Sequence, residues 1–211
     1  MRPIFTTQAR REPALCSLQF VGSALIIVGF LGPWVAHKTA ALTVTGYELS
    51  EFAKFFPQVQ GGVVPVRRGL FVAPLLAASI SLALVFQRSR TPSLLRVAAI
   101  ALAILLGLLA FPPYQSFLEP VYRLQLILVA AGLSLVLLTP LARQLSERIR
   151  GWLFLILALS AAGAALWQAV LLWPLVVQLY GAPVWPGWGA FVCAIGLLLL
   201  LFVSLHDLLR S

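Results

Sequence analysis

Charged residues are scarce in this sequence. Asp, Glu, Lys and Arg make up 10% of the 211 residues, against roughly 25% in a typical soluble domain. Hydrophobic residues make up 61%, and the mean hydropathy is +1.00. A chain with so little polar surface, and with its apolar residues in long runs, is not suited to water. The composition therefore indicates an integral membrane protein.

Cysteine and histidine are rare as well, with two of each. Cys16 precedes the first apolar run and Cys193 lies within the last one, so we expect no disulfide between them. His37 follows the first run and His206 ends the last, so we expect them on opposite membrane faces, too far apart to bind one haem iron. No metal-binding spacing is present. We therefore expect neither a metal nor a cofactor.

Motifs that carry catalysis are missing too. The sequence has no Gly-x-Ser-x-Gly, no His-Glu-x-x-His and no glycine-rich phosphate loop. The apolar runs contain no Asp or Glu, and Asp207 lies just beyond the last one. Ion-coupled transport generally needs ionisable groups within the spans. We therefore expect a protein that is not an enzyme and that neither pumps ions nor hydrolyses ATP by itself.

Six apolar runs are long enough, or nearly so, to cross a hydrocarbon core of about 30 Å. They lack the alternation of a membrane-spanning strand, so we expect helices. The sequence predicts an all-α, polytopic membrane protein with a bundle of about six transmembrane helices over 18–206, between cytoplasmic termini 1–17 and 207–211. The predicted spans are 18–35, 70–86, 94–111, 122–138, 152–177 and 188–205.

The first run follows a basic start, as the core of a signal peptide does, but no small-x-small cleavage site comes close behind it. Trp34, which follows Pro33, is instead typical of an anchor in the headgroup layer. We therefore expect a retained span. Pro174, near the outer end of the fifth run, predicts a tilt or kink there.

Basic residues set the expected orientation, because cytoplasmic loops carry an excess of Lys and Arg. With the N-terminus inside, ten of the 15 basic residues lie inside and five outside, which predicts a bacterial-type plasma membrane protein with both termini cytoplasmic. Because the net charge of +9 comes from such clusters between spans, we expect no nucleic-acid partner. The ten are Arg2, Arg10, Arg11, Arg88, Arg90, Arg96, Arg143, Arg148, Arg150 and Arg210, and the five are Lys38, Lys54, Arg67, Arg68 and Arg123.

The outer loop 36–69 contains the one polar, helix-forming stretch. Thr45 and Glu48 have the spacing of a capping box, so a short interfacial helix is predicted over 46–56. Pro57 is expected to end this helix. The residues just before the helix alternate between apolar and polar, which allows a short strand there. Glu51 and Lys54 have the spacing of a weak ion pair on its polar side.

The other side of this helix carries the apolar stripe Leu49, Phe52 and Phe56. Two interpretations are open for the stripe. The helix is either a lid packed on its own spans, or a docking surface on which these three side chains contact a partner.

Three further sites are candidates. Gln168 lies in the middle of the fifth span, where it is expected to bond a neighbouring helix or, alternatively, a substrate. Glu119 and Arg123 can pair at i, i+4 if the fourth helix begins there, either as a structural turn or as a substrate or quinone site. Small residues recur every four positions over 158–165, which favours close helix packing within the chain or against another subunit.

The sequence resembles no family through a motif. We expect a non-catalytic subunit or scaffold of a membrane complex, whose partners are the lipid bilayer and other membrane subunits or further copies of itself. The alternative is a permease subunit driven by a separate ATPase, for which six spans with both termini inside are suited.

Overall fold

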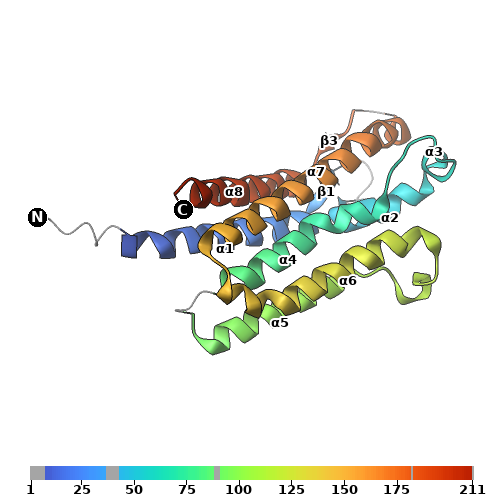
Figure 1. Cartoon of the computed structure of the whole chain (residues 1–211). Coiled ribbons are helices and arrows are strands. Elements are labelled where there is room, and N and C mark those ends of the chain that lie inside the picture. Colours follow the sequence, from blue (N-terminus) through green and yellow to red (C-terminus); the bar gives the residue numbers. More distant parts are fainter. Residues whose placement is uncertain (1–7, 37–42, 88–90, 182, 211) are drawn as a thin grey trace, which may run out of the picture.

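The computed structural model describes residues 8–36, 43–87, 91–181 and 183–210. Most of the described chain is helical, and the helices form an elongated bundle (Figure 1). The longer elements are α1 (Gln8–Leu31), α4 (Ala73–Val85), α5 (Ser93–Leu109), α6 (Arg123–Leu138), α7 (Glu147–Tyr180) and α8 (Trp188–Arg210). The shorter ones are β1 (Pro33–Ala36), β2 (Val44–Thr45), α2 (Gly46–Phe52), α3 (Pro57–Gln60), β3 (Trp185–Pro186) and the 3-10 helices η2 (Ala53–Phe55), η3 (Arg68–Val72), η4 (Tyr114–Ser116), η5 (Pro120–Tyr122) and η6 (Thr139–Gln144).

Four helical stretches within the described residues are long and apolar enough to cross a membrane. Two further helices are apolar but shorter, and they coincide with the first and third predicted spans. A membrane location therefore follows from the helix lengths. The four long stretches are Arg68–Val85, Pro120–Gln144, Arg148–Tyr180 and Trp188–Leu209, and the shorter ones are Leu15–Leu31 and Ser93–Leu109.

Helix α4 is the centre of the bundle. Nearly all of its side chains are buried, and it contacts α1, α5, α6 and α7, while α8 packs against α1 and α7. The start of α1 and the end of α8 lie at one end of the bundle, and α2 and α3 lie at the other (Figure 1). We call the end with α2 and α3 the outer end.

Glycines allow α1 and α8 to touch along their backbones. Gly22 and Gly29 are seven residues apart on α1, as Gly189 and Gly196 are on α8. A Cβ atom on Gly29 would lie 2.2 Å from the backbone nitrogen of Cys193, and one on Gly196 would lie 2.7 Å from the carbonyl oxygen of Gly22. The helices are thus antiparallel and in contact through small residues.

The structure corrects the end of the first predicted span. Helix α1 ends at Leu31, and Pro33–Ala36 form β1, which pairs antiparallel with both β2 and β3. Gly32 and Pro33 account for this change, since proline cannot continue the helical hydrogen-bond pattern. Trp34, predicted as a headgroup anchor, is instead buried and donates its indole N–H to the carbonyl of Gly29 at 3.0 Å.

The later helices also differ from prediction at their ends. Helix α7 starts five residues earlier than predicted, where Ser146 caps it by accepting from the N–H of Ile149, and it continues through Pro174 to Tyr180. Helix α8 extends to Arg210. Tyr122, the first residue of the fourth predicted span, is buried.

Candidate functional site

The outer polar stretch begins with a complete capping box. The Thr45 hydroxyl accepts from the N–H of Glu48 at 3.2 Å, and the Glu48 carboxylate accepts from the N–H of Thr45 at 2.8 Å. These two bonds satisfy amides that a helix leaves free at its first turn. The capping box predicted from the sequence is therefore confirmed, and it fixes the point at which β2 becomes α2.

The predicted helix over 46–56 is divided in the structure. It is α-helical to Phe52, tightens into the 3-10 helix η2, and ends at Phe56, whose backbone is extended. Pro57 does not simply end the helix, because it occupies the first turn of the separate helix α3. Proline is tolerated there, since a first-turn N–H has no helical partner.

The apolar stripe of this helix faces the protein's own bundle. Leu49 is 2% exposed and Phe56 is 6% exposed, and both belong to the main core. Phe52 is half-buried and packs edge-to-face against Phe56, with ring centroids 5.6 Å apart. This burial favours the lid over the docking surface; contact of the three side chains with a partner stays a prediction.

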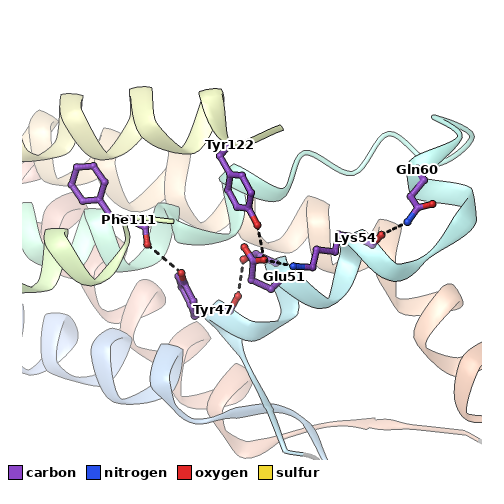
Figure 2. A network of polar contacts seen from close by, with 7 residues as sticks. Tyr47, Glu51, Lys54, Gln60, Phe111 and Tyr122 are labelled. Carbon is purple, nitrogen blue, oxygen red and sulfur yellow. Dashed lines mark hydrogen bonds and ion pairs between the residues drawn. The ribbon is translucent and has the colours of Figure 1, made fainter. Parts of the chain in front are cut away.

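A network of polar contacts joins α2 to the α5–α6 hairpin (Figure 2). Glu51 is its centre: its carboxylate accepts from the Tyr122 hydroxyl at 2.7 Å and from the Lys54 ammonium at 3.1 Å. The predicted Glu51–Lys54 pair is thus confirmed. Tyr47, one turn before Glu51, donates its hydroxyl to the carbonyl of Phe111 at 3.1 Å.

Arg68 lies against the same network. Its guanidinium carbon is 4.8 Å from the centroid of the Tyr122 ring, a cation–π distance. Its Nη1 is buried and has no hydrogen-bond partner among the described residues. The aromatic ring of Tyr122 therefore contacts a cation while its hydroxyl contacts an anion, which holds η3, α2 and the start of α6 together.

Burial and charge both act on Tyr47. Burial raises the pKa of its hydroxyl above the usual 10.0, and the nearby Glu51 carboxylate raises it further. Tyr47 is therefore a hydrogen-bond donor at neutral pH, as its contact with Phe111 requires.

Gln168 bonds to the residue that precedes a neighbouring helix, close to the helix contact that was predicted. Its side chain is 1% exposed, and its Oε1 accepts from the backbone N–H of Arg67, at the start of η3, at 2.7 Å. A buried amide needs a partner, and this contact supplies one without a substrate. Gln125 has a similar structural role, since its amide donates to the carbonyl of Ala110 at 2.7 Å, where α5 ends.

Glu119 and Arg123 do not form the predicted pair. Glu119 precedes η5 with an extended backbone, whereas α6 begins only at Arg123. The two residues are therefore not on one α-helix, and no ion pair joins them in the described part of the chain. Both side chains are exposed.

An open hollow of about 510 Å³ lies beside the outer end of α7. Its walls are mainly apolar, with Trp173 and Val177 from α7 and Trp185 from β3. It shares no residue with the Glu51 network. Among the described residues no group of three or more His, Cys, Asp or Glu side chains is placed to hold a metal ion.

The arrangement around Glu51 holds segments together. Each of its polar side chains has a partner within the chain, apart from one nitrogen of Arg68. Comparison with family models, with curated proteins and with solved structures found no match.

Two features of the structure were not predicted from the sequence. The Tyr122–Glu51 bond joins residues 71 positions apart, so no local sequence pattern could predict it. The glycine contact between α1 and α8 did leave a signal, because the same seven-residue glycine spacing occurs in the first and the last apolar runs.

Proposed function

We propose that this protein is a non-catalytic subunit or scaffold of a larger complex in a bacterial-type plasma membrane. In this proposal all six apolar helices cross the bilayer, both termini are cytoplasmic, and α2 lies at the outer membrane surface as a lid on the bundle. The excess of arginine at the inner end supports the orientation. The burial of Leu49 and Phe56 supports the lid.

The observation that carries the proposal is Gly163, in the middle of α7. The other glycines within the apolar helices all pack closely: a Cβ atom on any of them would lie within 3.2 Å of another element. A Cβ atom on Gly163 would meet nothing within 4 Å. Glycine lowers helix stability by about 1 kcal/mol relative to alanine in water, and in membranes small residues occur where helices approach closely.

The surroundings of Gly163 fit a contact with another helix. Ser160, three residues before Gly163, and Trp167, four residues after it, are exposed on the same face, as are Ile156 and Val170 further along it. The small residues Ser160 and Gly163 lie in the centre of this face, and the larger side chains of Ile156 and Val170 lie towards its ends. We assign to it the contact with a membrane-spanning helix of a partner subunit or of a second copy.

The test is tagged purification from native membranes in mild detergent, followed by mass spectrometry. The variant Gly163→Leu puts a large side chain in the centre of this face, and Ala131→Leu makes a comparable change at an exposed position of α6. We expect the partner to be lost from Gly163→Leu and retained by Ala131→Leu and by the natural protein. A natural protein that purifies alone would contradict the proposal.

A second candidate function is a permease subunit driven by a cytoplasmic ATPase. The inner connection between α6 and α7 supports it, because η6 and the first turn of α7 present Arg143 and Arg148 to solvent. Such a short basic segment can serve as a coupling surface. A stoichiometric ATPase in the purification would favour this function over the scaffold.

A further inference from the structure

The outer turn between α5 and α6, residues 111–122, exposes several large apolar side chains. Leu118 is 97% exposed and Tyr114 is 78% exposed, and Phe117 and Val121 are also exposed. The turn contains one charged residue, Glu119. Unlike Leu49 and Phe56 in the stripe of α2, none of these side chains is buried.

The turn has a defined shape. Two 3-10 helices, η4 and η5, form its backbone, and the N–H groups of Glu119 and Tyr122 donate to the carbonyls of Ser116 and Glu119 at 3.1 Å. The ring of Phe117 packs against that of Phe111 at a centroid distance of 5.7 Å. These contacts fix the backbone conformation in which the side chain of Leu118 is exposed.

Helix α5 is short for a bilayer. It has 17 residues, which gives a length of about 25 Å against a hydrocarbon core of about 30 Å, whereas the helical stretch that contains α6, Pro120–Gln144, has 25 residues. Arg96, in the first turn of α5, marks the inner boundary because a guanidinium stays near the headgroups. From Arg96 to the end of α5 at Leu109 the helix rises only about 20 Å.

Helices α7 and α8 of the same bundle are longer than α5. Helix α7 has 34 residues and α8 has 23, so their lengths are about 51 Å and about 34 Å. A bilayer that matches α8 in thickness covers the whole length of α5. The turn 111–122, which continues from the end of α5, then lies at the boundary of the acyl chains with the headgroups.

We propose that this turn is a lipid-contacting element, which inserts Leu118, Phe117 and Val121 into the outer leaflet and places the hydroxyl of Tyr114 among the headgroups. Apolar side chains with a tyrosine beside them suit that boundary, where one end of the ring is apolar and the other is hydrated. Arg123 follows the turn, and its long side chain reaches the headgroup phosphates. The inference rests on the membrane location alone and does not require a partner subunit.

The test is the depth of a spin label in nanodiscs of dioleoyl phosphatidylcholine. A Cys16→Ser background leaves the buried Cys193 as the remaining native thiol, and single labels are then placed by Leu118→Cys and Val121→Cys. Val63→Cys is the matched control, because Val63 is 78% exposed in the outer segment between α3 and η3. Collision rates with oxygen, which enters lipid, are compared with those of nickel-EDDA, which stays in water.

We expect oxygen collisions to prevail at positions 118 and 121, and nickel-EDDA collisions to prevail at position 63. The preference for oxygen at 118 should increase in dierucoyl phosphatidylcholine, since a thicker bilayer covers the outer end of the short helix α5 more deeply. Nickel-EDDA access at 118 equal to that at 63 would overturn the inference. An immobile label that neither reagent reaches would also overturn it, because the turn would then be covered by protein.

Discussion

The hydroxyl of Tyr122 donates a hydrogen bond of 2.7 Å to the carboxylate of Glu51, and so connects the start of α6 to the outer helix α2. Removing the hydroxyl with Tyr122→Phe should lower the free energy of unfolding by about 1–2 kcal/mol, because a hydrogen bond to a charged group is lost while Glu51 keeps Lys54. The measurement is unfolding in mixed micelles. Tyr114→Phe, at an exposed tyrosine, is the control and should leave the stability unchanged.

The glycine contact between α1 and α8 can be tested with matched substitutions. Gly29→Ala places a Cβ atom 2.2 Å from the backbone of Cys193, so the helices must separate, and we expect a loss of about 1–3 kcal/mol of unfolding free energy. Gly163→Ala meets open space and should keep or slightly raise the stability. Equal effects of the two substitutions would show that α1 and α8 do not touch through Gly29.

Loss of the capping box should destabilise α2 without affecting distant helices. Thr45→Ala removes the acceptor for the N–H of Glu48 and should destabilise α2 by about 1 kcal/mol. Hydrogen exchange of the amides in Gly46–Phe52 should become faster, while exchange in α4 and α7 stays the same. Thr43→Ala, two residues earlier and exposed, should have no effect on this exchange.

Gln168 should be required for the position of η3. Gln168→Leu leaves the N–H of Arg67 without its acceptor, and we expect a loss of about 1–3 kcal/mol of unfolding free energy. The control is Gln178→Leu, at an exposed position of the same helix. If Gln168→Leu left the stability unchanged, the hydrogen bond with Arg67 would not explain why an amide side chain is buried at position 168.

The raised pKa of Tyr47 predicts a loss of stability in alkali. Because the folded state holds the phenolic proton more tightly than the unfolded state, its contribution is complete below the unfolded pKa of 10.0 and is lost as the pH rises through the higher folded pKa. Unfolding measured from about pH 8 to about pH 11 should show this decline. Tyr47→Phe should decline less steeply over the same range.

Local sequence patterns predicted the features that depend on neighbouring residues. Thr45 and Glu48 form the capping box, and Glu51 and Lys54 form the ion pair, because residues three positions apart meet on any helix. The Glu119–Arg123 pair was wrong for the same physical reason: its spacing is useful only on one continuous α-helix, and the helix begins too late.

Aromatic residues near the ends of the spans were harder to place. Trp34 and Tyr122 carry both an apolar ring and a hydrogen-bond donor, so either one suits the headgroup layer or a buried position with an acceptor. The acceptors that bury them are the carbonyl of Gly29 and the carboxylate of Glu51. Of these, only the carbonyl of Gly29 is close in the chain.

The sequence by itself determined that the protein is a helical membrane protein, where its apolar helices lie, and where the outer helix α2 begins. These follow from composition, run length and short-range hydrogen bonding, which need no knowledge of distant residues. The tertiary structure alone decided that the stripe of α2 faces inward, that Gln168 contacts Arg67, and that Gly163 stays open while the other helix glycines are packed. Each of these depends on which helices become neighbours, and that is set by packing between segments far apart in the chain.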